Sequence, residues 1–275
     1  MTQRAARRWL LILPLAGSAS VAPIALPAQT DYYNTDDGRP LQTEDAYVLE
    51  RYAFELQLAP LRLERSRGGI HDWLIEPAIA YGILPRTHIE IGLPIAFVDA
   101  GESGTSAGLS GLDISVMHNL NVETRTLPAF GLAAHVLAPV GGLAADATYA
   151  SVKGIVTRTV SRVRLHLNGQ YTFGDEPGSR GEGNSGELSR WFAGLAVDHA
   201  LALRSMLIGG EVYAARPIFD DADVEWTAAA GIRYQLDPYF ALDAGIGKQL
   251  NGDARPWSVT LGLARAFAVR ALMPR

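Results

Sequence analysis

From residue 47 onward, apolar and polar residues alternate along the chain in about a dozen separate stretches. Between Trp73 and Phe97 most odd-numbered positions are large and apolar, whereas most even-numbered positions are small or charged. A period of two residues predicts β-strands, because successive side chains of a strand point to opposite faces. A continuous apolar face opposite a polar face is typical of a β-barrel whose outer surface meets membrane lipid.

The pattern predicts an all-β fold, a closed antiparallel transmembrane β-barrel of twelve strands. Spans of about ten residues suit a tilted strand that crosses the hydrocarbon of a membrane. An even number of strands also brings both ends of the barrel to the same side of the membrane. The twelve strands are expected near residues 47–58, 71–83, 87–97, 111–121, 127–139, 149–160, 162–173, 190–199, 204–215, 223–236, 239–249 and 256–267.

The predicted connections alternate in length along the chain. Outer-membrane barrels have short turns in the periplasm and longer loops outside the cell. With the amino terminus in the periplasm, every short turn of this chain falls on the periplasmic side. Short turns are expected around Pro85, Glu123, Ser161, Leu203 and Pro238, and longer loops at 59–70, 98–110, 140–148, 174–189, 216–222 and 250–255.

Aromatic residues fall near the ends of the predicted strands, at positions whose side chains would point outward. Such rings favour the headgroup level of a membrane, because one end is apolar and the other is wet. A soluble β-sandwich, the main alternative, would instead direct its aromatic side chains into one core. An outer girdle is expected from Trp73, Phe97, Tyr171, Trp191, Trp226 and Trp257, and an inner girdle from Tyr81, Phe130, Tyr234, Phe240 and Phe267.

One stretch also fits a membrane-spanning helix. Residues 127–145 carry no charge over nineteen residues, which is long enough to cross a bilayer. The stretch contains Pro128, Pro139 and three glycines, and both residue types disfavour helical structure. A strand is therefore the favoured interpretation of this stretch.

The first 28 residues have the order of a secretory signal peptide. Arg4, Arg7 and Arg8 precede a short apolar core at residues 9–15, which is too short to span a bilayer as a helix. Cleavage is expected after Ala28. Since the sequence has no cysteine, it excludes a lipid-anchored amino terminus, a disulfide framework and a thiolate metal site.

Removal of residues 1–28 would leave 21 basic and 29 acidic residues, a net charge of −8. This balance argues against nucleic acid as a partner and against a polybasic lipid-binding surface. The remaining 247 residues suit one large β domain. Residues 29–46 lack periodicity and are expected to form a periplasmic segment, with a plug in the lumen as the open alternative. The barrel is expected at 47–267 and a carboxyl-terminal tail at 268–275.

Charged and polar residues on the inward face are the candidates for function. A tight turn at Pro238 sets a register that places Arg233 opposite Asp243, and the loop before residue 190 places Arg164 opposite Asp198. Charges inside a barrel need partners or water, so these pairs either brace a narrow lumen or form a constriction that selects solutes. The expected lumen-lining residues are Glu76, Glu90, Asp113, Arg164, His166, Asp198, Glu211, Arg233 and Asp243.

The sequence predicts neither a metal site nor a cofactor. Of six histidines, no two have the spacing of a metal pair on one strand face, and only His166 is expected deep in the lumen. A hydrolase would need a serine beside a histidine, and no histidine has one two residues away, although a pair across strands stays open. The acidic residues near 220–225 fit a weak calcium site or a solvated loop, and the second interpretation is simpler.

Several short motifs resemble those of an outer-membrane family named for a meta-pathway of phenol degradation. The resemblance covers about residues 45–267 and departs from the family pattern at Leu112 and Val140. It implies a barrel that takes up small, aromatic compounds. The matching motifs are Ser110-Gly111-Leu112-Asp113, the stretch from Pro128 to Pro139-Val140-Gly141, and Glu211-Val212-Tyr213.

The last predicted strand resembles, in part, the carboxyl-terminal insertion signal of bacterial outer-membrane proteins. Thr260, Gly262 and Phe267 match that pattern, whereas Arg265 replaces its first aromatic residue. The resemblance implies recognition by the barrel-assembly machinery.

Together these patterns predict a porin-like, non-enzymatic channel in a Gram-negative outer membrane, for passive uptake of small, aromatic or hydrophobic molecules. The expected partners are outer-membrane lipid and lipopolysaccharide, the barrel-assembly machinery and a small-molecule solute. A structural or adhesive barrel with a plugged lumen is the first alternative, and an outer-membrane hydrolase is the second.

Overall fold

The computed structural model describes residues 25–26, 34–65, 71–99, 104–178, 188–253 and 255–273. Within these ranges the strands form one antiparallel sheet. The 3-10 helices η3 (Ala202–Arg204) and η4 (Arg270–Leu272) follow β11 and β15. The strands are β1 (Ala25–Leu26), β2 (Ala53–Arg65), β3 (His71–Leu84), β4 (Thr87–Gly92), β5 (Ile95–Asp99), β6 (Thr105–Leu109), β7 (Leu112–Asn121), β8 (Ala129–Ala138), β9 (Tyr149–Val160), β10 (Val163–Phe173), β11 (Ser189–Leu201), β12 (Met206–Pro217), β13 (Glu225–Asp237), β14 (Phe240–Gln249) and β15 (Trp257–Val269).

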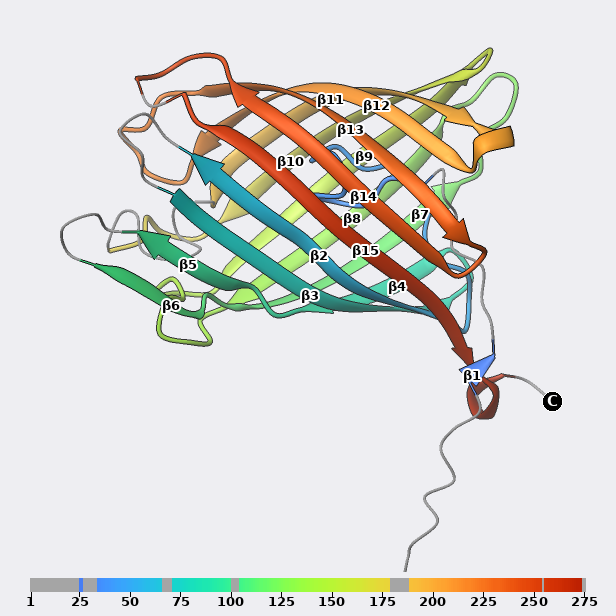
Figure 1. Ribbon diagram of the computed structural model, residues 1–275, viewed down its shortest axis with the longest axis horizontal. Helices are drawn as coiled ribbons and strands as arrows, with labels where there is room; N and C mark the ends of the chain where they lie inside the picture. The colour runs from blue at the N-terminus through green and yellow to red at the C-terminus, as the bar shows by residue number, and fades with distance from the viewer. Residues whose placement is uncertain are drawn as a thin grey trace, which may run out of the picture.

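The sheet closes into a barrel through β2, which pairs with β3 on one side and with β15 on the other (Figure 1). β4 and β5 share one position in the wall, since both pair with β3, and β6 and β7 share the next. β1 only adds two residues beside the end of β15. The wall therefore has twelve positions, and the predicted closed barrel of twelve strands is confirmed.

The first strand of the wall is displaced from its predicted place. β2 runs over Ala53–Arg65, not over 47–58. Its pairing with β3 shifts register between Leu58 and Leu61, which marks a bulge around Pro60. A bulge adds one residue and so interrupts the period of two, which is why the alternation in the sequence ends at residue 58. The other predicted strands lie within three residues of observed ones, but β6 is an additional strand that lies in the loop predicted at 98–110.

Two neighbouring positions of the wall are interrupted side by side. Pro94, between β4 and β5, has no amide hydrogen to donate to a sheet. Its carbonyl accepts hydrogen bonds from the amide (2.9 Å) and the hydroxyl (3.2 Å) of Ser110, which lies between β6 and β7. Beyond this interruption the β5–β6 hairpin continues past the rest of the wall (green, lower left of Figure 1).

The wall has apolar side chains outside and polar side chains inside. Leu167, Leu195 and Leu261 on the outer face are each more than half exposed, whereas His166 and Asp198 are almost completely buried. Exposed leucines around a closed barrel require a lipid environment, since water would leave that surface unfavourably hydrated. The polar interior rules out the soluble β-sandwich with an aromatic core.

Residues 127–145 contain β8 and not a membrane-spanning helix. β8 pairs with β7 and β9 over its whole length. In the described parts of the chain, no helix has the length and apolar character needed to cross a membrane.

The two ends of the chain extend the wall in different ways. The predicted signal peptide, residues 1–28, and its cleavage point lie outside the described residues apart from β1. At the other end, β15 continues to Val269 and η4 follows. The first part of the predicted tail, 268–275, therefore belongs to the wall.

Aromatic side chains form a stack on the outer face at the periplasmic ends of three neighbouring strands. The ring of Phe54 on β2 lies 4.4 Å from that of Tyr81 on β3 and 5.3 Å from that of Phe267 on β15, between centroids. Tyr81 and Phe267 are members of the predicted inner girdle, and Phe54 adds to them. Tyr234 of that girdle is exposed, and Phe130 and Phe240 are half-buried.

The residues of the predicted outer girdle lie at the opposite strand ends. The ring of Tyr171 also packs edge-on against Phe173, with 5.0 Å between centroids. Placement of these rings at a membrane interface stays a prediction. More than two fifths of each side chain is exposed in Trp73, Phe97, Tyr171, Trp226 and Trp257, and Trp191 is half-buried.

The aromatic stack can be tested with a double-mutant cycle on Phe54→Ala and Tyr81→Ala. We expect a coupling free energy of about 0.5–1.5 kcal/mol, because stacked rings interact beyond the area that they bury. The free energy of unfolding in denaturant, measured in lipid vesicles, gives this coupling. Leu56→Ala and Ile79→Ala, at directly paired positions of the same two strands, form the control cycle. Equal coupling in both cycles would show that the stack has no specific role.

Candidate functional site

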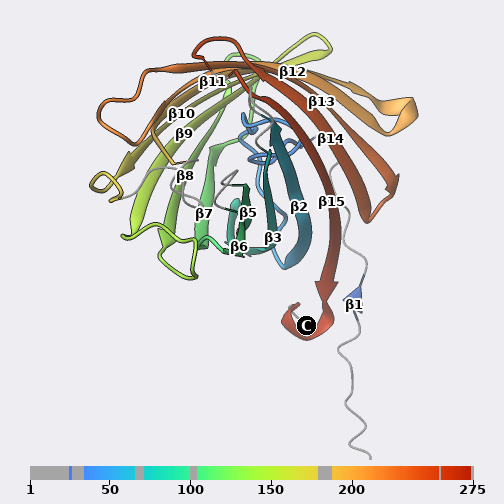
Figure 2. The same ribbon diagram turned by 60° about the vertical axis from the view of Figure 1, so that its left-hand side comes forward.

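Residues 34–52 are here called the plug, because most of this segment lies inside the barrel (blue in Figure 2), with Glu50 and Arg51 exposed at its end. Leu41, Thr43 and Ala46 are each at most 2% exposed. The sequence left two places open for residues 29–46, the periplasm and the lumen. The described part of this segment is in the lumen, and residues 29–33 lie outside the described residues.

Arginine–carboxylate contacts hold the first half of the plug. The Arg39 guanidinium lies 2.6 Å from Asp36 within the plug, 3.0 Å from Glu55 on β2 and 3.6 Å from Asp243 on β14. Arg233 on β13 lies 2.8 Å from Asp36 and 3.0 Å from Asp243, and it donates to the carbonyl of Asn34. Both guanidinium groups are buried, and each has more than one carboxylate partner, so neither buried cation lacks a counter-charge.

A second set of charges holds the middle of the plug. Arg164 on β10 contacts Asp198 on β11 at 2.7 Å and Asp45 of the plug at 3.2 Å. His166 Nε2 lies 2.9 Å from the same Asp198 carboxylate. The strand register places Arg164 opposite Asp198 and Arg233 opposite Asp243, so both predicted pairings are confirmed.

Lys153 on β9 supplies the cation for a third contact. Its ammonium lies 2.5 Å from Asp37 and 2.9 Å from Glu44. Ligand atoms of Asp37, Glu44 and His135 lie within 4.8 Å of one another, a spacing that a metal ion could also bridge. Because the Lys153 ammonium already contacts both carboxylates, this group reads as an ion-pair cluster.

Side chains of the wall also form hydrogen bonds with the backbone of the plug. The Glu211 carboxylate accepts from the amides of Gln42 and Thr43, both at 2.8 Å. Asn168 accepts from the Glu44 amide and donates to the Glu44 carbonyl, both at 2.9 Å. A segment without secondary structure needs such partners when it is buried, because its amides and carbonyls have no sheet to pair with.

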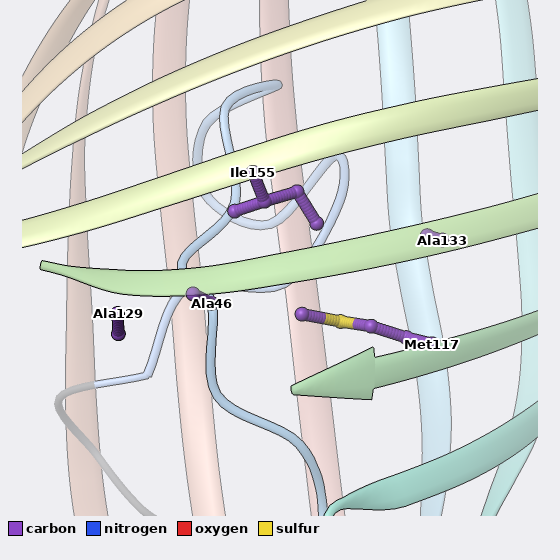
Figure 3. Close-up of a cluster of buried hydrophobic side chains, with 5 residues drawn as sticks. All are labelled: Ala46, Met117, Ala129, Ala133 and Ile155. Atoms are coloured by element: carbon purple, nitrogen blue, oxygen red, sulfur yellow. The ribbon is translucent and has the colours of Figure 1, made fainter. Parts of the chain in front are cut away.

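A small cluster of apolar side chains packs against Ala46, near the end of the plug. Figure 3 shows Ala46 beside Met117 of β7, Ala129 and Ala133 of β8 and Ile155 of β9. The Ala46 carbonyl also accepts from Asn119 at 2.6 Å, and its amide donates to the Thr157 hydroxyl at 2.9 Å. The plug therefore meets wall residues of both kinds.

Glycines on the inner wall leave room for the plug. A Cβ on Gly231 of β13 would lie 2.7 Å from Cβ of Pro40, and one on Gly194 of β11 would collide with Thr43. Glycines at such positions leave open space in the lumen. The plug fills part of that space.

Burial acts differently on two carboxyl groups of the plug. Desolvation raises the pKa of Glu44 to about 7, although the Lys153 ammonium opposes the shift. Desolvation would also raise the pKa of Asp36, but the charges of Arg233 and Arg39 outweigh it and hold this pKa below its usual value. Near neutral pH, Asp36 is therefore ionised, whereas Glu44 is partly protonated.

Polar cavities remain around the plug. One of about 220 Å³ is lined by Glu76 and Asp113. A second, of about 150 Å³, is lined by residues of β2 and β11–β15. A third, of about 80 Å³, lies nearer the periplasmic strand ends and is lined by Glu55 and Glu90. The inside of the barrel is thus divided by the plug but not filled.

Loops cover part of the extracellular mouth. The Ile218 amide donates to the Leu188 carbonyl at 2.9 Å, which ties the loop after β12 to the start of β11. Ile218 and Phe219 also pack against Ala145 and Tyr149, although β10 and β11 separate these segments in the wall. The loop after β12 therefore folds inward across the mouth.

The predicted lumen residues fall into two groups. Arg164, Glu211 and Arg233 contact the plug, and Asp243 contacts it at Arg39. His166 and Asp198 belong to the same group, because Asp198 pairs with Arg164 and His166 contacts Asp198. Glu76, Glu90 and Asp113 instead line cavities. Lys153 and Thr157 are further inward residues that sequence reasoning missed, and the alternation along 149–160 would have found them.

A hydroxyl, a histidine and a carboxylate do meet across strands. The Thr157 hydroxyl lies 3.0 Å from His166 Nδ1, and Asp198 lies 2.9 Å from Nε2. All three residues are buried, and none lines the cavities described above. The Thr157 hydroxyl already accepts from the Ala46 amide and Asp198 pairs with Arg164, so the arrangement serves to hold the plug.

Residues 24–267 match the model of a protein family described as "Putative MetA-pathway of phenol degradation". The chain belongs to this family. The resemblance found in the short sequence motifs is therefore confirmed. No curated protein sequence matches the chain.

Solved structures of outer-membrane proteins share the fold. An outer-membrane channel from Pseudomonas putida F1 is 14% identical, with a TM-score of 0.55 over 81% of this chain and 98% of that one. The KdgM porin is 11% identical, with a TM-score of 0.50 over 78% and 98% of the two chains. The NanC porin is 11% identical, with a TM-score of 0.50 over 76% and 98%. With its apolar outer face, this member of the family is a barrel of the outer membrane.

The fit between plug and wall can be tested with Gly231→Val. We expect the larger side chain to displace the plug, because even a Cβ at this position would overlap Pro40. Limited proteolysis of the folded barrel should then cleave within 34–46 at least about tenfold faster. A loss of about 1.4 kcal/mol in the free energy that holds the plug in the lumen corresponds to a factor of ten in the population of the released plug. Gly169→Val is the matched control, because a Cβ there meets no atom within 4 Å. Equal protection in both variants would contradict the close fit.

Proposed function

We propose that this protein is a passive, non-enzymatic channel for small molecules, in which the plug narrows the lumen. The observation that carries this proposal is the set of polar cavities around the plug, inside a wall whose outer face is apolar. Solutes cross a barrel where inward polar side chains leave space for them and for water. Glu76, Glu90 and Asp113 are then the residues that face the solute.

The comparisons favour this function over catalysis. The relative from Pseudomonas putida is named as a channel, and two further relatives in fold are named as porins. The family description names phenol degradation. Tyr149 and Phe192 add aromatic surface to the 220 Å³ cavity near the mouth, which suits a small solute with an apolar part.

The exterior suggests how the barrel meets its surroundings. We propose that the outer aromatic residues lie at the level of lipopolysaccharide and the inner ones at the periplasmic headgroups. The partial match at Thr260, Gly262 and Phe267 supports insertion by the barrel-assembly machinery. Cleavage of a signal peptide after Ala28 would leave residues 34–52 in place as the plug.

A structural barrel with a permanently seated plug is the second candidate. It is favoured by the buried ion pairs of Arg39, Arg164 and Arg233, each of which joins the plug to the wall or reinforces that contact. In that case the cavities would hold only water. The two candidates differ in whether the intact protein conducts.

Conductance across planar lipid bilayers separates these candidates. We expect the purified protein to give small, stable ion currents, and deletion of residues 34–46 to raise the conductance at least about threefold, because the deletion clears the cross-section of the lumen. The deletion variant should keep the heat-resistant migration of a folded barrel on a gel, which serves as its control. A folded protein that carries no current, beside a conducting deletion variant, would establish the permanently plugged barrel instead.

A further inference from the structure

Two of the cavities meet on one side of the plug. Asp37 of the plug and His135 of β8 line both the 220 Å³ cavity and the 80 Å³ cavity. The strands that line these two cavities are β2–β4 and β7–β11, with Arg233 from β13. A solute moving between the two cavities would therefore pass the plug at Asp37 and His135.

The walls of these two cavities are strongly acidic. Eight carboxyl groups line them, together with the cations of Lys153 and Arg233 and the histidines His88 and His135. Both cations are already engaged, Lys153 by Asp37 and Arg233 by carboxylates of its own cluster. Among the described residues, Glu90 and Asp113 take part in no ion pair, and Glu90 has a neutral partner, the amide of Gln57 at 3.0 Å.

The junction between the cavities already holds a cation that belongs to the protein. The Lys153 ammonium, with only 2% of its side chain exposed, lies between the plug carboxylates Asp37 and Glu44 at 2.5 and 2.9 Å. This contact shows which chemical group the junction accommodates. The Asp37 side chain is 43% exposed, so a passing ammonium can pair with it while Lys153 keeps its contact with Glu44.

We infer that small cations, and small molecules that carry an ammonium group, pass the seated plug along this face, here called the acidic corridor. The inference rests on the proposed channel function and adds its selectivity. Carboxylates along a narrow path concentrate cations and repel anions. Glu90 and Asp113 determine the preference, because they face the corridor without a cationic partner.

Reversal potentials in a gradient of potassium chloride test the selectivity. At about pH 9.5 we expect the wild-type channel to pass K⁺ at least about five times better than Cl⁻, and Glu90→Gln or Asp113→Asn to reduce this ratio by about half or more. Glu225→Gln is the matched control, because it removes the same charge from the 150 Å³ cavity, which neither Asp37 nor His135 lines. This control should change the ratio by less than about a fifth.

A reversible lock tests whether the plug stays seated during conduction. A Cβ on Gly131 would lie 3.4 Å from the Cα of Ala46, so Ala46→Cys with Gly131→Cys should form a disulfide. The chain has no other cysteine. We expect the oxidised lock to keep at least about half of the cation current. Gly154→Cys with Gly169→Cys, at paired positions of β9 and β10 away from other atoms, controls for oxidation itself.

Adding benzylammonium or benzoate at equal concentration tests the chemical class of solute. Benzylammonium should reduce the K⁺ current at least about threefold more than benzoate, because only the cation enters the corridor. Equal effects of the two ions would overturn the preference for ammonium groups.

The outcomes separate this inference from the proposed function. A wild-type protein without any current refutes the channel itself. A current without cation preference, an equal effect of Glu225→Gln, or loss of current in the oxidised lock refutes the acidic corridor and leaves the channel standing. The acidic corridor is supported if Glu90→Gln and Asp113→Asn lose the cation preference, Glu225→Gln keeps it, and the oxidised disulfide variant still carries current.

Discussion

The structure depends on the neutralisation of charges that are buried inside a membrane barrel. Asp36 of the plug lies between Arg39 and Arg233, and Asp45 completes the contacts of Arg164. Removing water from such groups is costly, and the cost is offset only when every charge has a partner. The plug and the wall therefore depend on each other, because each supplies the counter-charges that the other lacks.

This mutual dependence explains why the lumen is small and divided. The inner wall has glycine where the plug approaches most closely, as at Gly231, so the two surfaces meet without overlap. The remaining space is polar and lies around the plug, with its acidic side along β3, β4, β7 and β8. A narrow, charged path has a stronger effect on passing ions than a wide one, since water screens the lining charges less.

The same density of charge produces arrangements that resemble catalytic or metal sites. Thr157, His166 and Asp198 have the connectivity of a hydrolytic triad, and Asp37, Glu44 and His135 have the spacing of metal ligands. In each case the surrounding contacts account for the groups, through the Ala46 amide and Arg164 in the first case and Lys153 in the second. Short distances between such side chains are thus a consequence of packing a charged segment into a barrel.

The sequence by itself determined the wall, and only the tertiary structure decided what the wall encloses. Alternation with a period of two is a local property, so it predicted the strands and even the pairing of Arg233 with Asp243 across a tight turn. It failed at the bulge around Pro60, where one added residue shifts the parity. Residues 34–46 have no periodicity, and their partners lie up to 220 positions away in the chain. Their place in the lumen follows from long-range charge pairing, which no local pattern contains.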